Sequence, residues 1–333
     1  MANDWSLSDV GVVVIGRNEG ERLIACLGSI SVSGSRAVYV DSGSSDQSVA
    51  AAKALGWTVV QLDMSVPFSA ARARNAGLAA LMNAAPTLKL VQFVDGDCEL
   101  AAGWLLTAAR FLSAHDDVAV VCGRRRERHP ERSVYNRLCD IEWNTPIGEA
   151  KACGGDSMMR TDALAKVQGF NPSIIAGEEP ELCFRLSAQG YRIWRLDAEM
   201  TLHDAAMLQF SQWWRRGLRS GYGNAQVSWL QAGVDGGRMQ SANIRAFIWA
   251  AVLPAFIALA ALWHPAALLL LLLYPLQIAR IAWKRGPTEL QSWQYAFFIV
   301  LGNFPGCLGT MKFIVRTWRN QQSTLIEYKQ PGA

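Results

Sequence analysis

Short apolar runs alternate with helical patterns along the first third of the chain. Between the runs, apolar residues recur every three or four positions, as they do on one face of a helix. Runs that are apolar throughout fit strands buried on both faces of a sheet, and their alternation with helices is typical of βαβ units. The sequence therefore predicts an α/β fold with a mostly parallel sheet. The expected strands are 10–16, 37–41, 58–62, 90–95 and 118–123, and the expected helices are 21–30, 46–56, 69–84 and 103–114.

Polar residues follow three of these runs, where the strands end. The segments are GRNEGE at 16–21, DSGSSD at 41–46 and DGDCE at 95–99. An Asp-Gly-Asp segment by itself is more often a simple turn. In this context, however, ligands bind at the carboxyl ends of parallel strands. We therefore expect Asp41, Asp95 and Asp97 to gather in one crevice, although they are far apart in sequence.

The character of the chain changes near residue 246, where mixed polar and apolar sequence gives way to long apolar runs. The runs cover 247–263, 266–279 and 295–315, and Pro254, Pro275 and Pro305 interrupt them. Each run approaches the length needed to span a membrane. The alternative is a buried helical hairpin in a soluble domain. We expect a membrane hairpin over about 247–280, followed by a re-entrant or interfacial segment over about 295–315.

Basic residues around these runs indicate their orientation. Those before the first run are Arg215, Arg216, Arg219, Arg238 and Arg245, those after the second are Arg280, Lys284 and Arg285, and those near the end of the third are Lys312, Arg316 and Arg319. The positive-inside rule then places both flanks of the hairpin in the cytoplasm. The expected location is the cytoplasmic face of the inner membrane, in contact with membrane lipids.

Composition narrows the function further. No GxGxxG follows a strand and no GxxxxGK[ST] occurs, which disfavours a nicotinamide or flavin domain and a P-loop. The net charge is +4 without a block of like charge, so no nucleic-acid partner is expected. Seven scattered cysteines without a CxxC pair are typical of a reduced, cytosolic chain. The first residues have neither a basic stretch nor an apolar core, so a cleaved signal peptide is not expected.

Five segments in order carry a family resemblance. They are VVVIGRNEGERL, YVDSGSSDQS, FSAARARNAG, FVDGDCE and AGEEPELCFRL. As an ordered set they resemble family 2 glycosyltransferases of the GT-A fold, over roughly residues 10 to 230. The resemblance implies inverting transfer of a sugar from a nucleotide-sugar donor with a divalent cation, Mg²⁺ or Mn²⁺. It also implies a GT-A domain at 1–230, followed by interfacial and membrane helices at 231–333.

The resemblance assigns residues to the donor and the cation. Asp97 would bind the cation directly, while Asp95 would lie nearer the ribose or a metal-bound water. Carboxylate oxygens suit such a hard cation. His203 either completes the metal site or is structural. The nucleotide-sugar-binding candidates are Arg17, Asn18, Glu19, Asp41, Arg74, Asn75, Asp95 and Gly96, with Arg74 balancing the diphosphate.

The acceptor side also has candidates. Glu179 aligns with the family's catalytic base, at a position usually held by Asp, and Glu178 would orient the pocket. A glycine-rich loop is expected to shape the acceptor pocket, and a Trp-Arg segment is either an amphipathic interfacial helix or a gating loop. These acceptor or gating candidates are Gly154, Gly155, Asp156, Trp213, Trp214, Arg215 and Arg216.

The sequence as a whole predicts a membrane-attached glycosyltransferase. Its acceptor is expected to be membrane-associated and lipid-linked, in the synthesis of a cell-envelope glycan or polysaccharide. QWWRR differs from the QxxRW segment of processive synthases, so processivity is not supported. Three alternatives stay open: a processive polysaccharide synthase, a nucleotidyltransferase, and a catalytically inactive membrane-bound nucleotide-binding module.

Overall fold

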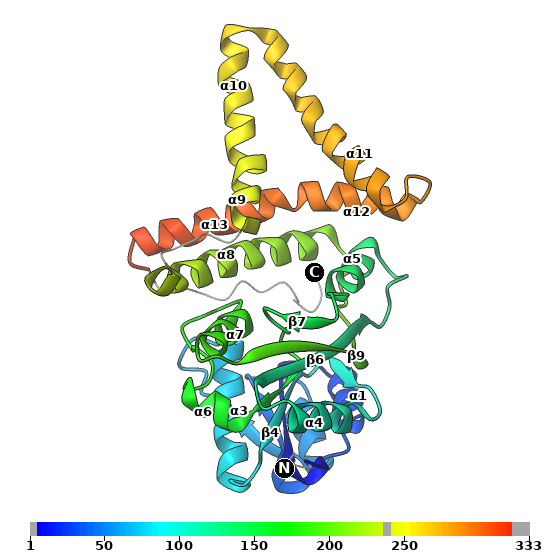
Figure 1. The fold of residues 1–333 in the computed structure, drawn as a ribbon, viewed down its shortest axis with the longest axis vertical. Coiled ribbons are helices and arrows are strands. Elements are labelled where there is room, and N and C mark those ends of the chain that lie inside the picture. The colour runs from blue at the N-terminus through cyan, green and yellow to red at the C-terminus, as the bar shows by residue number, and fades with distance from the viewer. Residues whose placement is uncertain (1–4, 236–240, 322–333) are drawn as a thin grey trace. The chain divides into compact units, whose positions relative to one another are not determined.

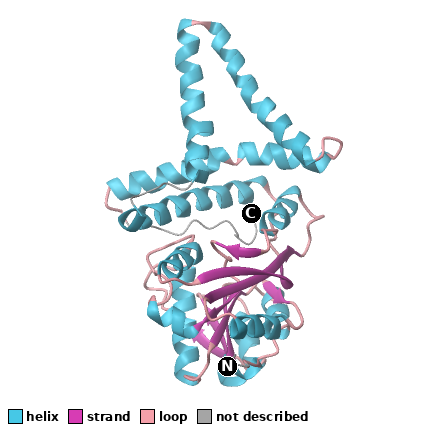
Figure 2. Cartoon of the chain, viewed as in Figure 1, coloured by secondary structure: helices cyan, strands magenta, loops and turns pink. Residues whose placement is uncertain are grey.

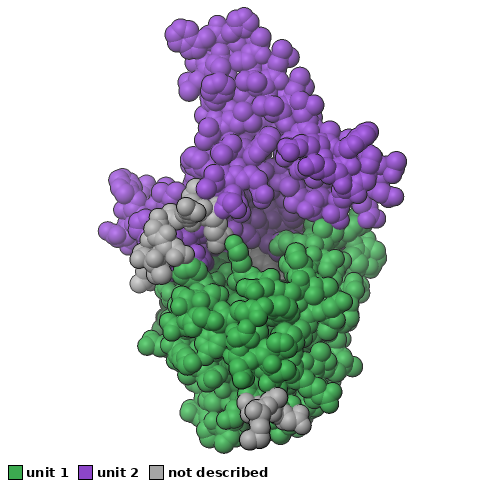
Figure 3. All heavy atoms as spheres, in the orientation of Figure 1, with its two compact units in different colours: residues 1–206 green, residues 207–333 purple. Residues whose placement is uncertain are grey.

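The chain divides into two compact units. The computed structural model describes residues 5–235 and 241–321. The first unit is residues 1–206 and the second is residues 207–333 (Figure 3). The boundary expected near residue 230 falls inside helix α8 (Phe210–Asp235), which belongs to the second unit. The expected boundary follows the extent of the family resemblance, whereas α8 packs on the apolar helices that follow.

One sheet of nine strands organises the described part of the first unit (Figures 1 and 2). The strands are β1 (Val10–Gly16), β2 (Ala37–Asp41), β3 (Thr58–Gln61), β4 (Leu90–Asp95), β5 (Cys98–Leu100), β6 (Val118–Glu127), β7 (Gly148–Ala150), β8 (Ser157–Arg160) and β9 (Arg192–His203). Their order is β3-β2-β1-β4-β8-β6-β9-β5, and β7 pairs with β9.

The first four strands are parallel, as the sequence predicts. β1 lies between β2 and β4, and β2 pairs with β3. β8 then inserts between β4 and β6 and runs antiparallel to both. The fifth expected strand, β6, therefore pairs with β8 and β9 rather than with β4. The α/β class with a parallel-dominated sheet is confirmed, and the sheet is mixed because of this insertion.

Helices cover both faces of the sheet. Alternate residues of a strand point to opposite faces, and Val12 and Val14 lie in one apolar cluster while Val13 and Ile15 lie in the other. The first cluster includes residues of α1 and α4, and the second includes residues of α3, α6 and α7. Their bounds are α1 (Glu21–Gly28), α2 (Ser48–Ala54), α3 (Ala70–Ala84), α4 (Trp104–Ala114), α5 (Val134–Trp143), α6 (Thr161–Lys166) and α7 (Glu178–Ala188), with short 3₁₀ turns at Leu7–Asp9 and Gly34–Arg36.

The second unit is helical, with apolar helices as the sequence predicts. After α8 come α9 (Ser241–Phe247), a π-helical segment (Ile248–Val252), α10 (Leu253–Trp263), a 3₁₀ segment (Pro265–Leu272), α11 (Leu273–Arg285), α12 (Leu290–Leu301) and α13 (Asn303–Trp318). Among the residues that the structure describes, three stretches are long and apolar enough to cross a membrane: Ser241–Trp263, Pro265–Arg285 and Leu290–Trp318. The first two form the expected hairpin, which turns at His264 (Figure 1).

Helices α8 and α13 pack backbone against backbone. A Cβ on Gly221 would overlap the backbone of Gly306, and one on Gly309 would overlap the Leu218 carbonyl oxygen. Thr310 Oγ1 also donates to the Gly221 carbonyl at 3.3 Å. Small residues permit such close approach between apolar helices. In Figure 1, α12 and α13 run crosswise to the hairpin, and α13 lies along α8. The re-entrant or interfacial placement of 295–315 stays a prediction.

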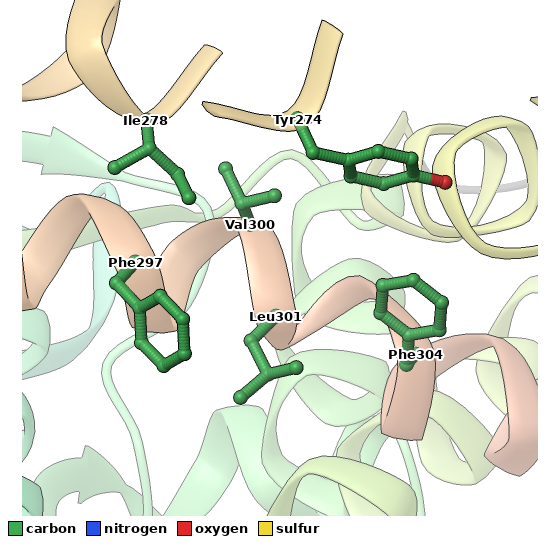
Figure 4. A pocket seen from close by; sticks show the side chains of 6 residues that line it. All are labelled: Tyr274, Ile278, Phe297, Val300, Leu301 and Phe304. Carbon is green, nitrogen blue, oxygen red and sulfur yellow. The ribbon is translucent and has the colours of Figure 1, made fainter. Parts of the chain in front are cut away.

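An apolar cavity of about 250 Å³ lies in the second unit. Its lining residues come from α11, α12 and α13 and are Tyr274, Ile278, Phe297, Val300, Leu301 and Phe304 (Figure 4). The Tyr274 hydroxyl donates to the Trp249 carbonyl at 2.6 Å, so that polar atom is already engaged. The cavity is therefore suited to hydrocarbon rather than to a sugar.

Candidate active site

The loops after β1 and β2 are joined by hydrogen bonds at the carboxyl edge of the sheet. Asn18 has φ 55°, in the left-handed region, and its N–H donates to Ser44 Oγ at 2.9 Å. Its side-chain oxygen accepts from the Ser45 N–H at 2.7 Å. The third loop joins them, because the Gly96 N–H donates to the Ile15 carbonyl at 2.8 Å. The three polar segments therefore do meet at one edge of the sheet.

Asp41 is buried and turned into its own loop. Its Oδ2 accepts from the N–H groups of Gly43 and Ser44, each at 3.0 Å, and its Oδ1 accepts from the Tyr39 hydroxyl at 3.1 Å. The carboxylate thus shapes the β2–α2 loop. In the neighbouring loop Arg17 is exposed and Glu19 forms an ion pair of 2.7 Å with the Arg22 guanidinium. Nucleotide contacts by these side chains stay predictions.

Arg74 connects two parts of the edge. Its buried guanidinium donates to Asp95 Oδ1 at 2.7 Å and to Glu178 Oε1 at 2.6 Å. Asp95 ends β4, whereas Glu178 begins α7. From the family resemblance, Arg74 is expected to compensate the negative charge of the diphosphate. In this structure its charge is engaged by two carboxylates of the protein, and its contact with the diphosphate stays a prediction.

Two residues near Arg74, Gly155 and Asn75, are closely packed against other segments. A Cβ on Gly155 would overlap Arg74 Nη2 and lie 3.1 Å from Asp95 Oδ2, so a larger residue there would have to displace the Arg74 guanidinium. Asn75 donates through Nδ2 to the Phe170 carbonyl at 2.7 Å and accepts from the Phe170 N–H at 2.9 Å. The Asn75 amide therefore fastens α3 to the segment before α7, and this geometry offers no support for its predicted contact with the nucleotide.

Asp97 and His203 meet although 106 positions separate them. Strand pairing brings Cys98 opposite His203, and Asp97 Oδ2 lies 3.1 Å from His203 Nε2. Ligand atoms of Asp97, Cys98 and His203 all lie within 4.8 Å of one another. The Cys98 thiol donates to Asp97 Oδ1 across 3.6 Å, and burial raises the pKa of this thiol well above its ordinary value. Of these three groups, the Asp97 carboxylate and the His203 imidazole are the ones expected to hold the cation.

The surroundings keep His203 neutral. Burial lowers the pKa of its imidazole, and the nearby Arg125 guanidinium lowers it further. Nδ1 is buried and has no hydrogen-bond partner among the described protein groups. A neutral imidazole is the form that binds a metal. The donor set of Asp97 and His203 therefore fits a divalent cation.

Asp156 stands behind this edge and is completely buried. It accepts from the Asp95 N–H at 2.9 Å and from Thr201 Oγ1 at 3.2 Å, and it lies 3.0 Å from Arg125 Nε. Burial by itself would raise the pKa of Asp156, but the Arg125 guanidinium and the hydrogen bond from the Asp95 N–H bring it below the ordinary value. The buried carboxylate thus holds the end of β4, and its expected acceptor contact stays a prediction.

Arg125 is a residue that the sequence analysis missed. It lies in the run RRRE at 124–127, where alternate residues of β6 point to opposite faces. Its Nη2 is buried and would lie 3.1 Å from a Cβ at Gly154, which has φ 90°. The alternation of side chains along β6, which turns Arg125 toward the site, could have identified this residue from the sequence.

Glu179 lies at the start of α7 and is buried. Its Oε1 accepts from the Cys153 N–H at 2.7 Å and from the Cys183 thiol at 2.9 Å. Its Oε2 is buried and has no hydrogen-bond partner among the described groups. Burial raises the pKa of the carboxyl. A carboxylate with one oxygen fixed and the other unengaged has the properties of a proton acceptor.

The Trp-Arg segment lies on α8, in the second unit. Trp213 packs edge to face on Phe298, with ring centroids 5.0 Å apart, and contacts Trp214 and Phe210. Arg215 is exposed and Arg216 is half-buried. The segment is therefore helical and held against α12. Its gating role stays a prediction.

Comparisons with known proteins agree with this architecture. The family model described as "Glycosyl transferase family 2" matches residues 11–164, and the one described as "Glycosyl transferase family group 2" matches residues 143–303. No curated protein matches the sequence.

Two solved structures are similar to the chain. Mannosyltransferase PcManGT from Pyrobaculum calidifontis, in complex with GDP-Man and Mn²⁺, has a TM-score of 0.56 and 19% identity, over 88% of this chain and 86% of that chain. Residues 1–349 of S. aureus TarS give a TM-score of 0.48 and 15% identity, over 91% of both chains. At these identities the likeness to PcManGT concerns the fold.

Together, the mixed sheet with helices on both faces and the likeness to PcManGT identify the GT-A fold. The two family matches run jointly from residue 11 to residue 303, and the chain belongs to the family 2 glycosyltransferases. Its C-terminal region consists of apolar helices that fit membrane-associated segments.

Proposed function

We propose that this glycosyltransferase transfers a sugar, with inversion, from a nucleotide-sugar donor to a lipid-linked acceptor at the cytoplasmic face of a membrane. Its product would be part of a cell-envelope glycan. The observation that carries the proposal is the pair of Asp97 and neutral His203, 3.1 Å apart at the carboxyl edge of the sheet. Family membership sets the nucleotidyltransferase alternative aside.

A divalent cation would be held by Asp97 and His203, with Asp95 beside them. When bound, such a cation stabilises the negative charge that gathers on the departing diphosphate. Carboxylates suit Mg²⁺ and Mn²⁺, whereas imidazole favours transition metals. The mixed set therefore favours Mn²⁺ over Mg²⁺, and the fold neighbour PcManGT was solved with Mn²⁺ and GDP-Man.

Glu179 is the proposed base of the transfer. The acceptor hydroxyl oxygen forms a bond to the anomeric carbon as the bond from that carbon to the diphosphate breaks. The hydroxyl proton passes to Glu179 Oε2, and the electron pair of the broken bond leaves with the nucleotide. Because Oε1 is held by Cys153 and Cys183, the carboxylate stays oriented during this single displacement. One displacement inverts the anomeric centre.

Features of the second unit support an acceptor in the membrane. Its three apolar stretches suit a bilayer, and Arg280, Lys284 and Arg285 follow the hairpin at the end expected to be cytoplasmic. The cavity lined by carbon atoms of α11, α12 and α13 suits a hydrocarbon chain (Figure 4). These features are consistent with a lipid that carries the acceptor group.

Asp97→Asn tests the proposal, because it keeps the size of the side chain and removes its charge. Binding of GDP and UDP is measured by calorimetry on the full-length protein in detergent, with Mn²⁺ and with EDTA. We expect the parent to bind one nucleotide in a metal-dependent manner and Asp97→Asn to lose that dependence and turnover. Asp116→Asn is the matched control, since Asp116 is exposed and lies away from this edge.

Two outcomes would contradict the proposal. One is metal-dependent binding and turnover in Asp97→Asn equal to the parent. The other is a parent enzyme indifferent to EDTA. If the parent binds nucleotide with metal but neither hydrolyses nor transfers any donor sugar, the inactive-module alternative is correct instead.

A further inference from the structure

Helix α5 is fixed to the end of β6 by buried polar contacts. Asn136 is fully buried and donates through Nδ2 to Glu127 Oε1 at 3.1 Å. Arg124 Nη2 donates to Asp140 Oδ1 at 2.9 Å, and the same oxygen accepts from the Glu127 N–H at 3.0 Å. These bonds join the helix to the strand. The last residue of the helix, Trp143, therefore has a defined place.

That place is beside the candidate cation site. The indole of Trp143 stacks on the His203 imidazole, with ring centroids 4.6 Å apart and planes only 8° from parallel. The Arg125 guanidinium lies 5.6 Å from the centroid of the same indole. Trp143 thus lies against His203, the neighbour of Asp97, and near Arg125, the neighbour of Asp156.

His203 needs something to set the rotation of its ring. A metal-binding histidine ordinarily donates its second ring nitrogen to a carboxylate or a carbonyl, and that bond orients the ring. Here Nε2 faces Asp97, whereas Nδ1 is buried without a hydrogen-bond partner among the described protein groups. No protein acceptor in the described ranges supplies the usual bond. The group that lies flat against the His203 ring is the Trp143 indole.

We propose that Trp143 is a positioning residue of the cation site, whose stacked indole holds the His203 imidazole with Nε2 toward Asp97. This inference rests on the proposed cation-dependent function. Aromatic stacking energies correspond to a change of about 2- to 10-fold in an equilibrium constant. Removal of the indole should weaken cation binding by about that factor, because the imidazole can then rotate away from Asp97.

The test measures Mn²⁺ binding directly, without turnover. Mn²⁺ affinity is obtained from the free-ion signal in electron paramagnetic resonance, and the coupling of a histidine nitrogen to Mn²⁺ is measured by pulsed methods. The proteins are the full-length parent, Trp143→Ala, Trp143→Phe and Trp194→Ala. Trp194 is the matched control because it lies on the same strand as His203 but packs near Phe111, with ring centroids 5.9 Å apart.

We expect Trp143→Ala to raise the Mn²⁺ dissociation constant about 2- to 10-fold and to weaken the nitrogen coupling. Trp143→Phe retains a flat ring, so it should lie between Trp143→Ala and the parent. Trp194→Ala should match the parent. A purely structural role would lower the unfolding temperature and leave the nitrogen coupling unchanged. Should Trp143→Ala fail to fold, Trp143→Phe carries the test.

Two results would overturn the inference, and they differ in what else they remove. If Asp97→Asn abolishes Mn²⁺ binding while both Trp143 variants keep the affinity and nitrogen coupling of the parent, only the role of Trp143 is wrong. If the parent binds no Mn²⁺ with or without nucleotide, the cation-dependent function fails and this inference fails with it.

Discussion

Glu179→Gln is the sharpest test of the transfer step. The amide keeps the shape of the carboxylate, and its oxygen can still accept from the Cys153 N–H and the Cys183 thiol. Its NH₂ group then occupies the position of Oε2, the atom that we propose receives the acceptor's proton. An amide nitrogen is a donor and cannot take that proton.

The expected loss of turnover in Glu179→Gln follows from the role of Glu179 as a general base. General-base catalysis contributes ~10²–10⁴-fold to a rate, which corresponds to roughly 3–5 kcal/mol of transition-state stabilisation. The buried NH₂ group without an acceptor costs about 1–3 kcal/mol of folding free energy, and the loss of a buried charge offsets part of this. We therefore expect a folded enzyme with unchanged nucleotide affinity and a much lower kcat.

The assay is nucleotide release at saturating donor and acceptor, measured across pH. Burial raises the pKa of Glu179 in the parent, so turnover should fall as the pH drops through that raised pKa and the base becomes protonated. Glu179→Gln should be slow at every pH and lack this acid limb. Glu179→Asp keeps a carboxylate and should retain measurable turnover if the shorter side chain still reaches the hydroxyl.

The control lies on the same helix. Glu181 is buried and pairs with Arg185 at 2.8 Å, so Glu181→Gln perturbs α7 without touching Glu179, and it should keep turnover within a few-fold of the parent. Turnover of Glu179→Gln equal to that of the parent, or an acid limb that persists in Glu179→Gln, would refute the assignment. The base would then be sought at Glu178.

Two further predictions concern packing in the first unit, and a third concerns membrane attachment. Gly155→Ala places a Cβ against Arg74 Nη2 and should lower donor affinity about 10-fold by displacing the pair with Asp95, as calorimetry would detect; an unchanged affinity would contradict this. Asn136→Ala removes a fully buried donor to Glu127 and should cost about 1.5–3 kcal/mol of folding free energy, seen as a lower unfolding temperature, whereas Asn144→Ala at an exposed site should have little effect. The full-length protein should stay in the membrane pellet after an alkaline carbonate wash, and recovery in the supernatant without detergent would mean that the apolar stretches form a buried helical domain.

Hydrophobic patterning along the sequence predicted the buried strands and the apolar hairpin. The valine-rich runs became β1, β2 and β4 because uninterrupted apolar residues suit a strand buried on both faces. The acids that follow them reached one edge because parallel strands share their carboxyl ends. The hairpin was equally predictable, since length and apolar composition decide whether a helix suits a membrane.

Contacts between segments that are far apart in the sequence could not be predicted in this way. Nothing in the short segment Ser157–Arg160 indicates that it inserts antiparallel between β4 and β6, and that insertion carries Asp156 into the core. Trp143 meets His203 only because β6, α5 and β9 are already folded. These contacts join residues far apart in sequence, whereas periodicity reports only on near neighbours.

The bridge formed by Arg74 has a thermodynamic consequence for the two substrates. One guanidinium holds Asp95, on the donor side, and Glu178, which precedes the proposed base. Any donor that draws Asp95 away changes the restraint on the first turn of α7. Coupling between two binding equilibria is reciprocal, so an acceptor that engages α7 must alter donor affinity by the same factor. If the donor and the acceptor engage Asp95 and α7 in this way, a single arginine would couple the two binding equilibria.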